Sequence, residues 1–119
     1  MHRYPVLVVD DDPTILATVG DALAFEDYTV ATATNGVEAL EAVERANPAV
    51  VLLDMRMPVL DGWGFAREAA ARGLRPKILV MTAAQDARRW AEEIGAAGYL
   101  AKPFELPDLL DAVQRAYGA

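Results

Sequence analysis

Polar residues that can handle metal ions and phosphate groups follow several of the apolar runs in this sequence. They are Asp10, Asp11, Asp54, Thr82 and Lys102. Each lies at or just beyond the end of a short apolar run of the kind that forms a buried strand. In open sheets of parallel strands, ligands bind outside the carboxyl ends of the strands. The spacing therefore predicts that all five side chains converge on one edge of a sheet.

The chemistry of this set can be stated from the residue types alone. Clustered carboxylates repel one another unless a cation or protons separate them, and a hard divalent ion with oxygen ligands, here Mg²⁺, is the expected remedy. A carboxylate can also attack phosphorus, while Mg²⁺ and a lysine neutralise the phosphoryl oxygens and a threonine hydroxyl donates to one of them. In outline, the residues form an aspartyl-phosphate site.

Five apolar runs are expected to position these residues. Four consecutive branched apolar residues at Val50–Leu53 predict a central strand buried on both faces. Further apolar runs predict strands at Val6–Val9, Lys77–Met81 and Tyr99–Ala101. Residues Tyr28–Ala33 alternate more and include threonines, which favours an edge strand with one partly solvated face.

Two helices are predicted before the central strand. The first begins at Pro13 with Asp12 as its N-cap. The second follows the turn at Asn35-Gly36 and ends before Pro48. The residues expected to face inward are Ile15, Leu16, Val19 and Leu23 in the first helix and Val37, Leu40 and Val43 in the second.

Three more helices are predicted after the central strand, over about 62–71, 86–94 and 106–117. The last has Leu109, Leu110 and Val113 on its buried face. Strands that alternate with helices predict an α/β fold with a parallel sheet covered on both sides. We expect one domain over residues 1–119.

Composition narrows the possible functions. Eighteen acidic against eleven basic residues give a formal net charge of −7, which argues against a domain that binds nucleic acid through its phosphates. The chain has no cysteine, so it carries neither disulfides nor a thiolate metal site. No apolar run approaches the length that spans a bilayer. We expect a cytoplasmic protein without membrane association.

Several spaced motifs together resemble a known family. The pattern resembles the receiver domain of bacterial two-component response regulators over essentially the whole chain. The motifs, in order, are Asp10-Asp11, Asp54 with Met57-Pro58 and Asp61-Gly62, Thr82-Ala83, and Gly98-Tyr99-Leu100 leading to Lys102-Pro103-Phe104. The resemblance implies a flavodoxin-like (βα)5 three-layer sandwich with a five-stranded parallel sheet of order 2-1-3-4-5.

The resemblance also implies a role for each residue of the site. Asp54 would accept a phosphoryl group from a histidine kinase or phosphotransfer protein, and the chain would catalyse its own phosphorylation and dephosphorylation there. Lys102 would pair with the phosphoryl group, and Thr82 would be drawn toward it. The Mg²⁺ ligands would be Asp11, Asp54 and the backbone carbonyl of Arg56, with Asp10 acting through water.

Signalling would follow from a change of surface. By the resemblance, Tyr99 would swing inward as Thr82 moves and alter the surface of the fourth helix, fifth strand and fifth helix, where a downstream output protein or domain would dock. A monomer or weak homodimer is expected. The Lys102-Pro103 bond is expected to be cis, as it commonly is in such domains.

Two features depart from the commoner pattern of the family. The interval from Thr82 to Lys102 looks slightly shorter than in many relatives, which affects the fourth helix. Arg56 and Ala84 occupy positions that line the route of a hydrolytic water in similar domains. A long cationic side chain at position 56 could shield the phosphoryl group, so we hypothesise an altered phosphoryl lifetime.

Other interpretations remain open from sequence. The run Asp10-Asp11-Asp12-Pro13-Thr14 also fits the Asp-x-Asp-x-Thr pattern of haloacid-dehalogenase-like phosphatases, with Asp10 as nucleophile, although that reading leaves Asp54 unexplained. A flavodoxin-like domain that binds flavin or nucleotide is disfavoured by the acids and the lack of a Gly-rich loop. Tyr99 is open to a second interpretation, as a packed aromatic with no switch role. Trp63 and Trp90 are expected to be partial core or partner-surface residues, and His2 is expected to be inert.

Overall fold

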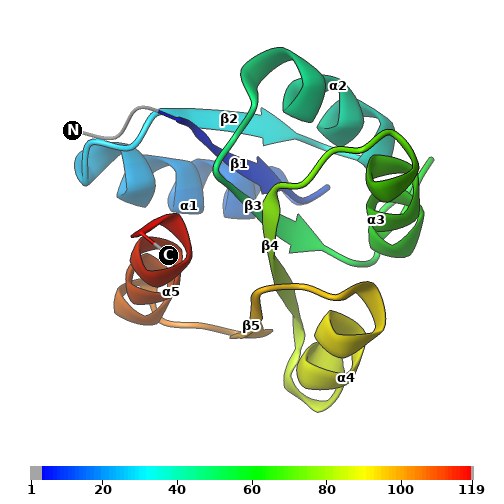
Figure 1. Ribbon diagram of the computed structural model, residues 1–119. Helices are drawn as coiled ribbons and strands as arrows, with labels where there is room; N and C mark the ends of the chain where they lie inside the picture. Colours follow the sequence, from blue (N-terminus) through cyan, green and yellow to red (C-terminus); the bar gives the residue numbers. More distant parts are fainter. Residues whose placement is uncertain (1–3, 119) are drawn as a thin grey trace.

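The predicted strands form one parallel sheet. The structure is a computed structural model that describes residues 4–118, and His2 therefore lies outside the described residues. Its five strands lie in the order β2-β1-β3-β4-β5, which confirms the predicted order and places β2 at an edge (Figure 1). The bounds are β1 Val6–Val9, β2 Val30–Ala33, β3 Val50–Asp54, β4 Lys77–Ala83 and β5 Gly98–Lys102.

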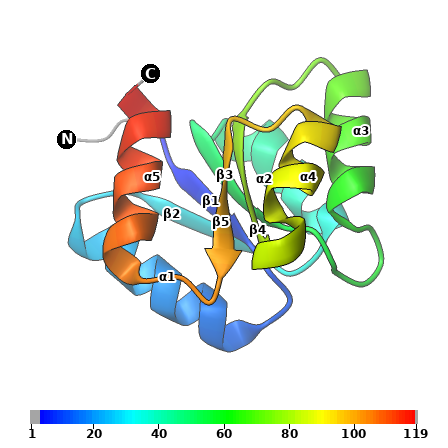
Figure 2. The ribbon, with the colours of Figure 1, turned by 90° about the horizontal axis from the view of Figure 1, so that it is seen from below.

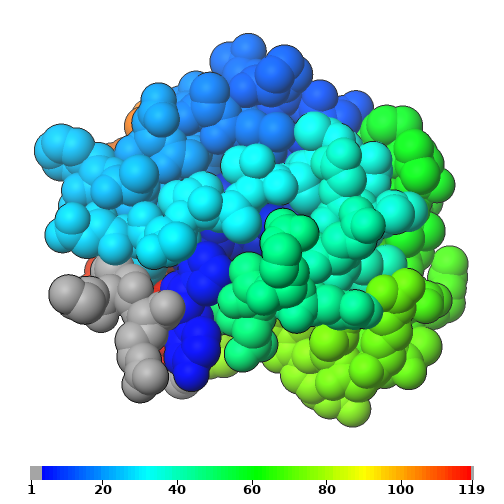
Figure 3. Space-filling model, turned by 90° about the horizontal axis from the view of Figure 1, so that it is seen from above, coloured from blue at the N-terminus to red at the C-terminus, as the bar shows by residue number. Residues whose placement is uncertain are grey.

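Five helices cover the two faces of this sheet. On one face lie α1 (Pro13–Phe25) and α5 (Leu106–Gly118), and on the other lie α2 (Gly36–Ala46), α3 (Gly62–Ala71) and α4 (Ala84–Ile94). Figures 1 and 2 show this three-layer arrangement from two directions. In Figure 3 the chain around the edge strand β2 (cyan) runs between α1 and α2. The flavodoxin-like sandwich is confirmed.

Strand alternation explains how the sheet forms two apolar layers. Every residue of β1, and Val50–Leu53 in β3, is fully buried. Because neighbouring side chains in a strand point to opposite faces, Val9 and Leu53 pack with α2, α3 and α4, whereas Val8 and Leu52 pack with α1 and α5. The two central strands thus hold their carboxyl ends rigidly at the edge where the acidic residues lie.

Side chains cap three of the helices that begin at this edge. Asp12 Oδ1 accepts a hydrogen bond from the Thr14 N–H at 2.9 Å, which confirms the predicted N-cap of α1. The side chains of Asn35 and Asp61 cap α2 and α3 in the same way. Such caps satisfy backbone donors that have no partner within the helix.

The structure corrects several details. Val37 was predicted to face the core, but it is 44% exposed, and the small residues Ala39 and Ala42 supply the buried contacts of α2 with Leu40 and Val43. Strand β2 begins at Val30 rather than Tyr28, and α4 begins at Ala84 rather than at residue 86. Helix α4 therefore follows β4 with no residue between them.

Two other expectations can be compared directly. The Lys102–Pro103 peptide bond is cis, as predicted. Within residues 4–118 no helix is both long enough and apolar enough to cross a membrane.

Candidate functional site

Strand register brings the charged residues of the site to one face of the sheet edge. Asp54 is in register with Met81 on β4, and Lys102 is in register with Ala83, two residues further along. In-register partners and residues two apart point to the same side of a parallel sheet. Asp54 and Lys102 therefore project from the α1 and α5 side, where Asp10 also emerges just beyond β1.

Lys102 is held between two aspartates. Its Nζ lies 2.8 Å from Asp10 Oδ2 and 3.8 Å from Asp54 Oδ1. The other oxygen of Asp10 accepts a hydrogen bond from the Asp12 N–H at 2.9 Å. Asp10 is buried and both its oxygens have partners, so it fixes the ammonium of Lys102 beside Asp54.

A cluster of three carboxylates meets the requirements of a divalent cation. Asp10, Asp11 and Asp54 each offer an oxygen, and these oxygens all lie within 4.8 Å of one another. Asp11 is exposed, whereas Asp10 and Asp54 are buried, so an ion could enter from solvent on the Asp11 side. Hard cations such as Mg²⁺ prefer an all-oxygen donor set of this kind, and the residues therefore fit that ion.

The environment of Asp54 makes its carboxylate costly to ionise. The pKa of Asp54 is raised from 3.8 to about 6; burial is the largest cause, and the negative charges of Asp10 and Asp11 also act to raise it. The ammonium of Lys102 and the hydrogen bond from the Arg56 backbone N–H act in the opposite direction on this pKa. Asp54 as a residue is 7% exposed, and a bound cation would relieve the cost of its negative charge.

Thr82 and Tyr99 lie on the other side of the sheet edge. Thr82 is buried at the end of β4, one residue beyond the partner of Asp54. Tyr99 is in register with Val80, two residues before Thr82, so both side chains point to the α4 side. Tyr99 is 47% exposed, which is the outward position from which the predicted inward swing would start.

The side chain of Arg56 lies away from Asp54. Its backbone N–H donates to Asp54 Oδ1 at 3.4 Å, but its guanidinium carbon lies 4.9 Å from the centroid of the Trp90 ring. Trp90 is buried and contacts Trp63 edge-on, with ring centroids 4.8 Å apart, and Trp63 Nε1 donates to Glu93 at 3.0 Å. The sequence did not predict this cluster, because 34 positions separate Arg56 from Trp90 and no local pattern joins them.

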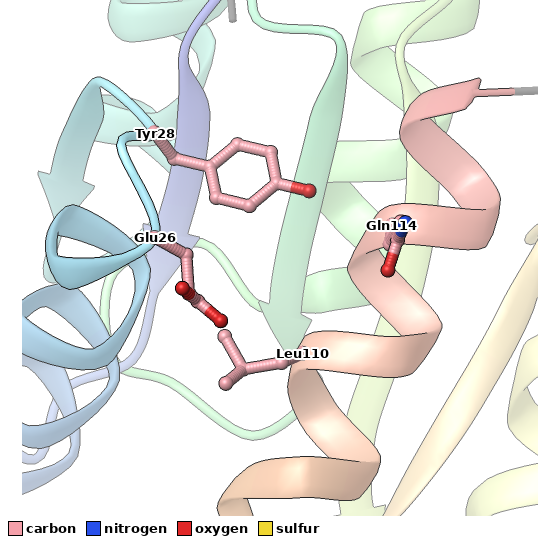
Figure 4. A pocket seen from close by; sticks show the side chains of 4 residues that line it. All are labelled: Glu26, Tyr28, Leu110 and Gln114. Atoms are coloured by element: carbon pink, nitrogen blue, oxygen red, sulfur yellow. The ribbon is translucent and has the colours of Figure 1, made fainter. Parts of the chain in front are cut away.

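A hollow elsewhere on the molecule contains none of the predicted site residues. It lies at the amino end of β2, and Figure 4 shows the Tyr28 ring pointing across it toward α5. The residues that line it are Glu26, Tyr28, Leu110 and Gln114. This hollow is therefore separate from the cluster of Asp10, Asp11 and Asp54.

Comparisons with known proteins agree with this geometry. A family model described as the response regulator receiver domain matches residues 6–114. The response regulator MprA of Mycobacterium leprae is 40% identical over 111 residues, which are 92% of this chain and 49% of MprA. The chain therefore spans about half the length of that relative.

Solved structures show the same arrangement. The chemotaxis response regulator CheY4 of Vibrio cholerae has a TM-score of 0.85 at 32% identity, and the match covers 95% of this chain and 98% of that one. The receiver domain of the sensor histidine kinase PA1611 from Pseudomonas aeruginosa has a TM-score of 0.87 at 33% identity, with 98% of both chains covered. Its structure has a magnesium ion coordinated in the active site cleft.

The phosphatase alternative is not supported. None of these matches is to a haloacid-dehalogenase-like enzyme. In the structure both oxygens of Asp10, the nucleophile in that alternative, are engaged by Lys102 and by the Asp12 N–H.

Proposed function

This chain belongs to the family of response regulator receiver domains, which are phosphoacceptor signalling domains, and we propose that Asp54 is its phosphoryl acceptor. The observation that carries the proposal is the position of Asp54, a buried carboxylate at the end of β3 with the Lys102 ammonium 3.8 Å away. The donor is a phosphohistidine of a histidine kinase or phosphotransfer protein.

The transfer requires one bond to form and one to break. An oxygen of Asp54 attacks the phosphorus, the phosphorus–nitrogen bond of the donor breaks, and the imidazole nitrogen leaves with the electron pair and takes up a proton. Lys102 lies where it can pair with the phosphoryl oxygens, and the Thr82 hydroxyl can donate to one of them after a small movement. Hydrolysis of the acyl phosphate returns Asp54 to its carboxylate.

Mg²⁺ is the proposed cofactor. Its ligands in this chain would be Asp11, Asp54 and the backbone carbonyl of Arg56, and Asp10 would act through water. When bound, the ion neutralises charge on the transferring phosphoryl group. The cluster of three carboxylates and the magnesium ion in the PA1611 receiver domain support this assignment.

The output of the domain is a change in its surface. Movement of Thr82 toward the phosphoryl group would leave space beneath α4, and Tyr99 would turn into it from its exposed position. A downstream output protein or domain would then bind the surface of α4, β5 and α5. We place this exchange in the cytoplasm, with residues 1–119 acting as one domain that is a monomer or weak homodimer.

Phosphorylation by a small donor tests the proposal. Purified protein is incubated with Mg²⁺ and acetyl phosphate, and the intact mass is recorded for wild type and for Asp54→Asn, Asp10→Asn and Asp12→Asn. We expect a single phosphoryl adduct on wild type and none on Asp54→Asn. Asp12→Asn is the matched control, because asparagine preserves the N-cap of α1 and the residue lies beside the site without belonging to it.

Two results would contradict the proposal. An adduct that survives in Asp54→Asn and disappears in Asp10→Asn would make Asp10 the nucleophile. Absence of an adduct on folded wild-type protein would indicate a receiver domain that binds its partners without phosphorylation.

A further inference from the structure

Arg56 is connected to the acidic site and to α4 at the same time. Its backbone N–H donates to Asp54, and its side chain lines the hollow that Asp11 and Asp61 also line. The guanidinium at the end of that side chain packs over the ring of Trp90, in the middle of α4. A movement of this one side chain would therefore change the surroundings of Trp90, a buried residue of α4.

The Arg56 guanidinium lies over Trp90 of α4 without an ion pair to a carboxylate, among the residues that the structure describes. Within residues 4–118, the Arg56 guanidinium has no Asp or Glu oxygen within 4.0 Å, whereas Arg89, which lies 6.0 Å from the same ring, is paired with Asp86 at 2.7 Å. A guanidinium that has only an aromatic face as partner is available to a stronger acceptor.

Phosphorylation would supply such an acceptor close by. A phosphoryl group on Asp54 adds a charge approaching −2 and three acceptor oxygens, two residues along the chain from Arg56. Bidentate, charge-assisted hydrogen bonds from arginine to phosphate are stronger than a partly exposed cation–π contact. In the unmodified site Asp10 and Asp54 are paired with Lys102, and the Arg56 guanidinium lies over the Trp90 ring.

The position of Trp90 allows it to transmit the change. Its ring packs edge-on against Trp63 of α3, and Trp63 is hydrogen-bonded to Glu93 one turn further along α4. Helix α4 follows β4 without a connecting residue, and its N-cap Ala83 makes no capping hydrogen bond through its side chain. The contacts of Trp90 therefore join the middle of α4 to α3 and to Arg56.

We infer that Arg56 is a further phosphoryl-binding residue, whose guanidinium leaves Trp90 for the phosphoryl oxygens when Asp54 is modified. The inference rests on the proposed function and deepens it, because it names the side chain that links the modified aspartate to α4. It also gives the hypothesised effect on phosphoryl lifetime a mechanism, since the guanidinium would screen the phosphorus only after it has moved.

Tryptophan fluorescence tests the movement. The chain has two tryptophans, so Trp63→Phe leaves Trp90 as the sole emitter. Emission is recorded before and after treatment with acetyl phosphate and Mg²⁺, and the fraction of adduct is measured by intact mass in the same samples. We expect a change in emission in proportion to the adduct. When Arg56→Gln is added to Trp63→Phe, the change in Trp90 emission should be lost in samples with the same fraction of adduct. When Arg89→Gln is added instead, as the matched control, the change should remain.

The lifetime of the adduct is a second readout, which needs no tryptophan variant. After removal of acetyl phosphate, Arg56→Gln in the otherwise wild-type chain should lose its phosphoryl group at least about threefold faster, the effect of one modest hydrogen bond on a rate. Arg89→Gln should decay at the wild-type rate.

The outcomes separate this inference from the proposed function. An adduct whose formation leaves Trp90 emission unchanged, or changes it equally with and without Arg56, would overturn the inference and leave the acceptor role of Asp54 intact. Equal decay in wild type and Arg56→Gln would do the same. No adduct on the wild-type chain would overturn the proposed function, and the inference with it.

Discussion

Replacement of the acceptor should stabilise this domain, and the effect should depend on pH. In the folded chain the pKa of Asp54 is raised from 3.8 to about 6, with burial as the largest cause. The folded state therefore binds the proton more tightly than the unfolded state does. Stability is lost as the pH rises from about 4 through 6, and the penalty is complete above that range. Asp54→Asn removes the charge and keeps an oxygen that can accept from the Arg56 N–H.

The magnitude follows from the size of the pKa shift. A rise from 3.8 to about 6 corresponds to about 3 kcal/mol of penalty on the ionised form. Water reaches part of the carboxylate and screens it, so we expect Asp54→Asn to raise the free energy of unfolding by about 2 kcal/mol at pH 8. At pH 4 the wild-type carboxyl is protonated in the folded chain, and the difference should be close to zero.

Urea denaturation measures this difference directly. Wild type and Asp54→Asn are unfolded at pH 4 and at pH 8 in EDTA, because a bound cation would relieve the penalty in wild type. Asp21→Asn, an exposed aspartate of α1, is the matched control and should show no comparable gain at pH 8. A gain that is the same at both pH values, or a loss at pH 8, would refute the explanation by burial and neighbouring charge.

Three further changes should have measurable effects. Saturating Mg²⁺ should bind the folded wild-type protein, add about 1–3 kcal/mol to its free energy of unfolding and so raise its thermal midpoint. Asp11→Asn should lose most of this increase, because it removes one of the three carboxylates of the site. Gly62→Ala should destabilise by about 1–3 kcal/mol in urea, because its Cβ would lie 2.8 Å from Met55 Cα, whereas Gly20→Ala meets only an ordinary contact and should stabilise α1. Val59→Gly should stabilise by about 1 kcal/mol in urea, because Val59 has φ of 70° and is 79% exposed.

Each of these expectations has a clear contrary result. If Mg²⁺ raised the thermal midpoint of Asp11→Asn as much as that of wild type, Asp11 would not be a ligand of the ion. Equal changes in the free energy of unfolding of Gly62→Ala and Gly20→Ala would mean that the close approach to Met55 does not destabilise the alanine variant. Loss of stability in Val59→Gly would mean that the valine is not strained, although the Leu60 N–H bonded to the Pro58 carbonyl at 2.8 Å closes a tight turn around it.

Much of the fold could be predicted from the sequence because its signals are local. The run Val50–Leu53 has no polar residue, which is typical of a strand covered on both faces. Asp12 followed by Pro13 fixes the start of α1. Val37 was wrongly assigned to the core, because the apolar spacing does not show that the buried face of α2 is centred on Gly36, Ala39 and Leu40.

The sequence predicts which residues form the site but not which of them contact one another. The ends of parallel strands must meet, so Asp10, Asp54 and Lys102 were expected to converge. That Lys102 bonds closely to Asp10 and stands further from Asp54 depends on register and on the twist of the sheet. The position of Arg56 on Trp90 depends on how α4 packs against the loop after β3, which no local pattern encodes.

The most direct test of the account is to locate the phosphoryl group on the chain. An aspartyl phosphate is an acyl phosphate, which borohydride reduces to the alcohol, so the modified aspartate becomes homoserine. Wild-type protein is phosphorylated with acetyl phosphate and Mg²⁺, reduced and digested, and the peptides are sequenced by mass spectrometry. The account predicts homoserine at position 54 alone. Homoserine at position 10 or 11, or none in protein that carries the adduct, would contradict it.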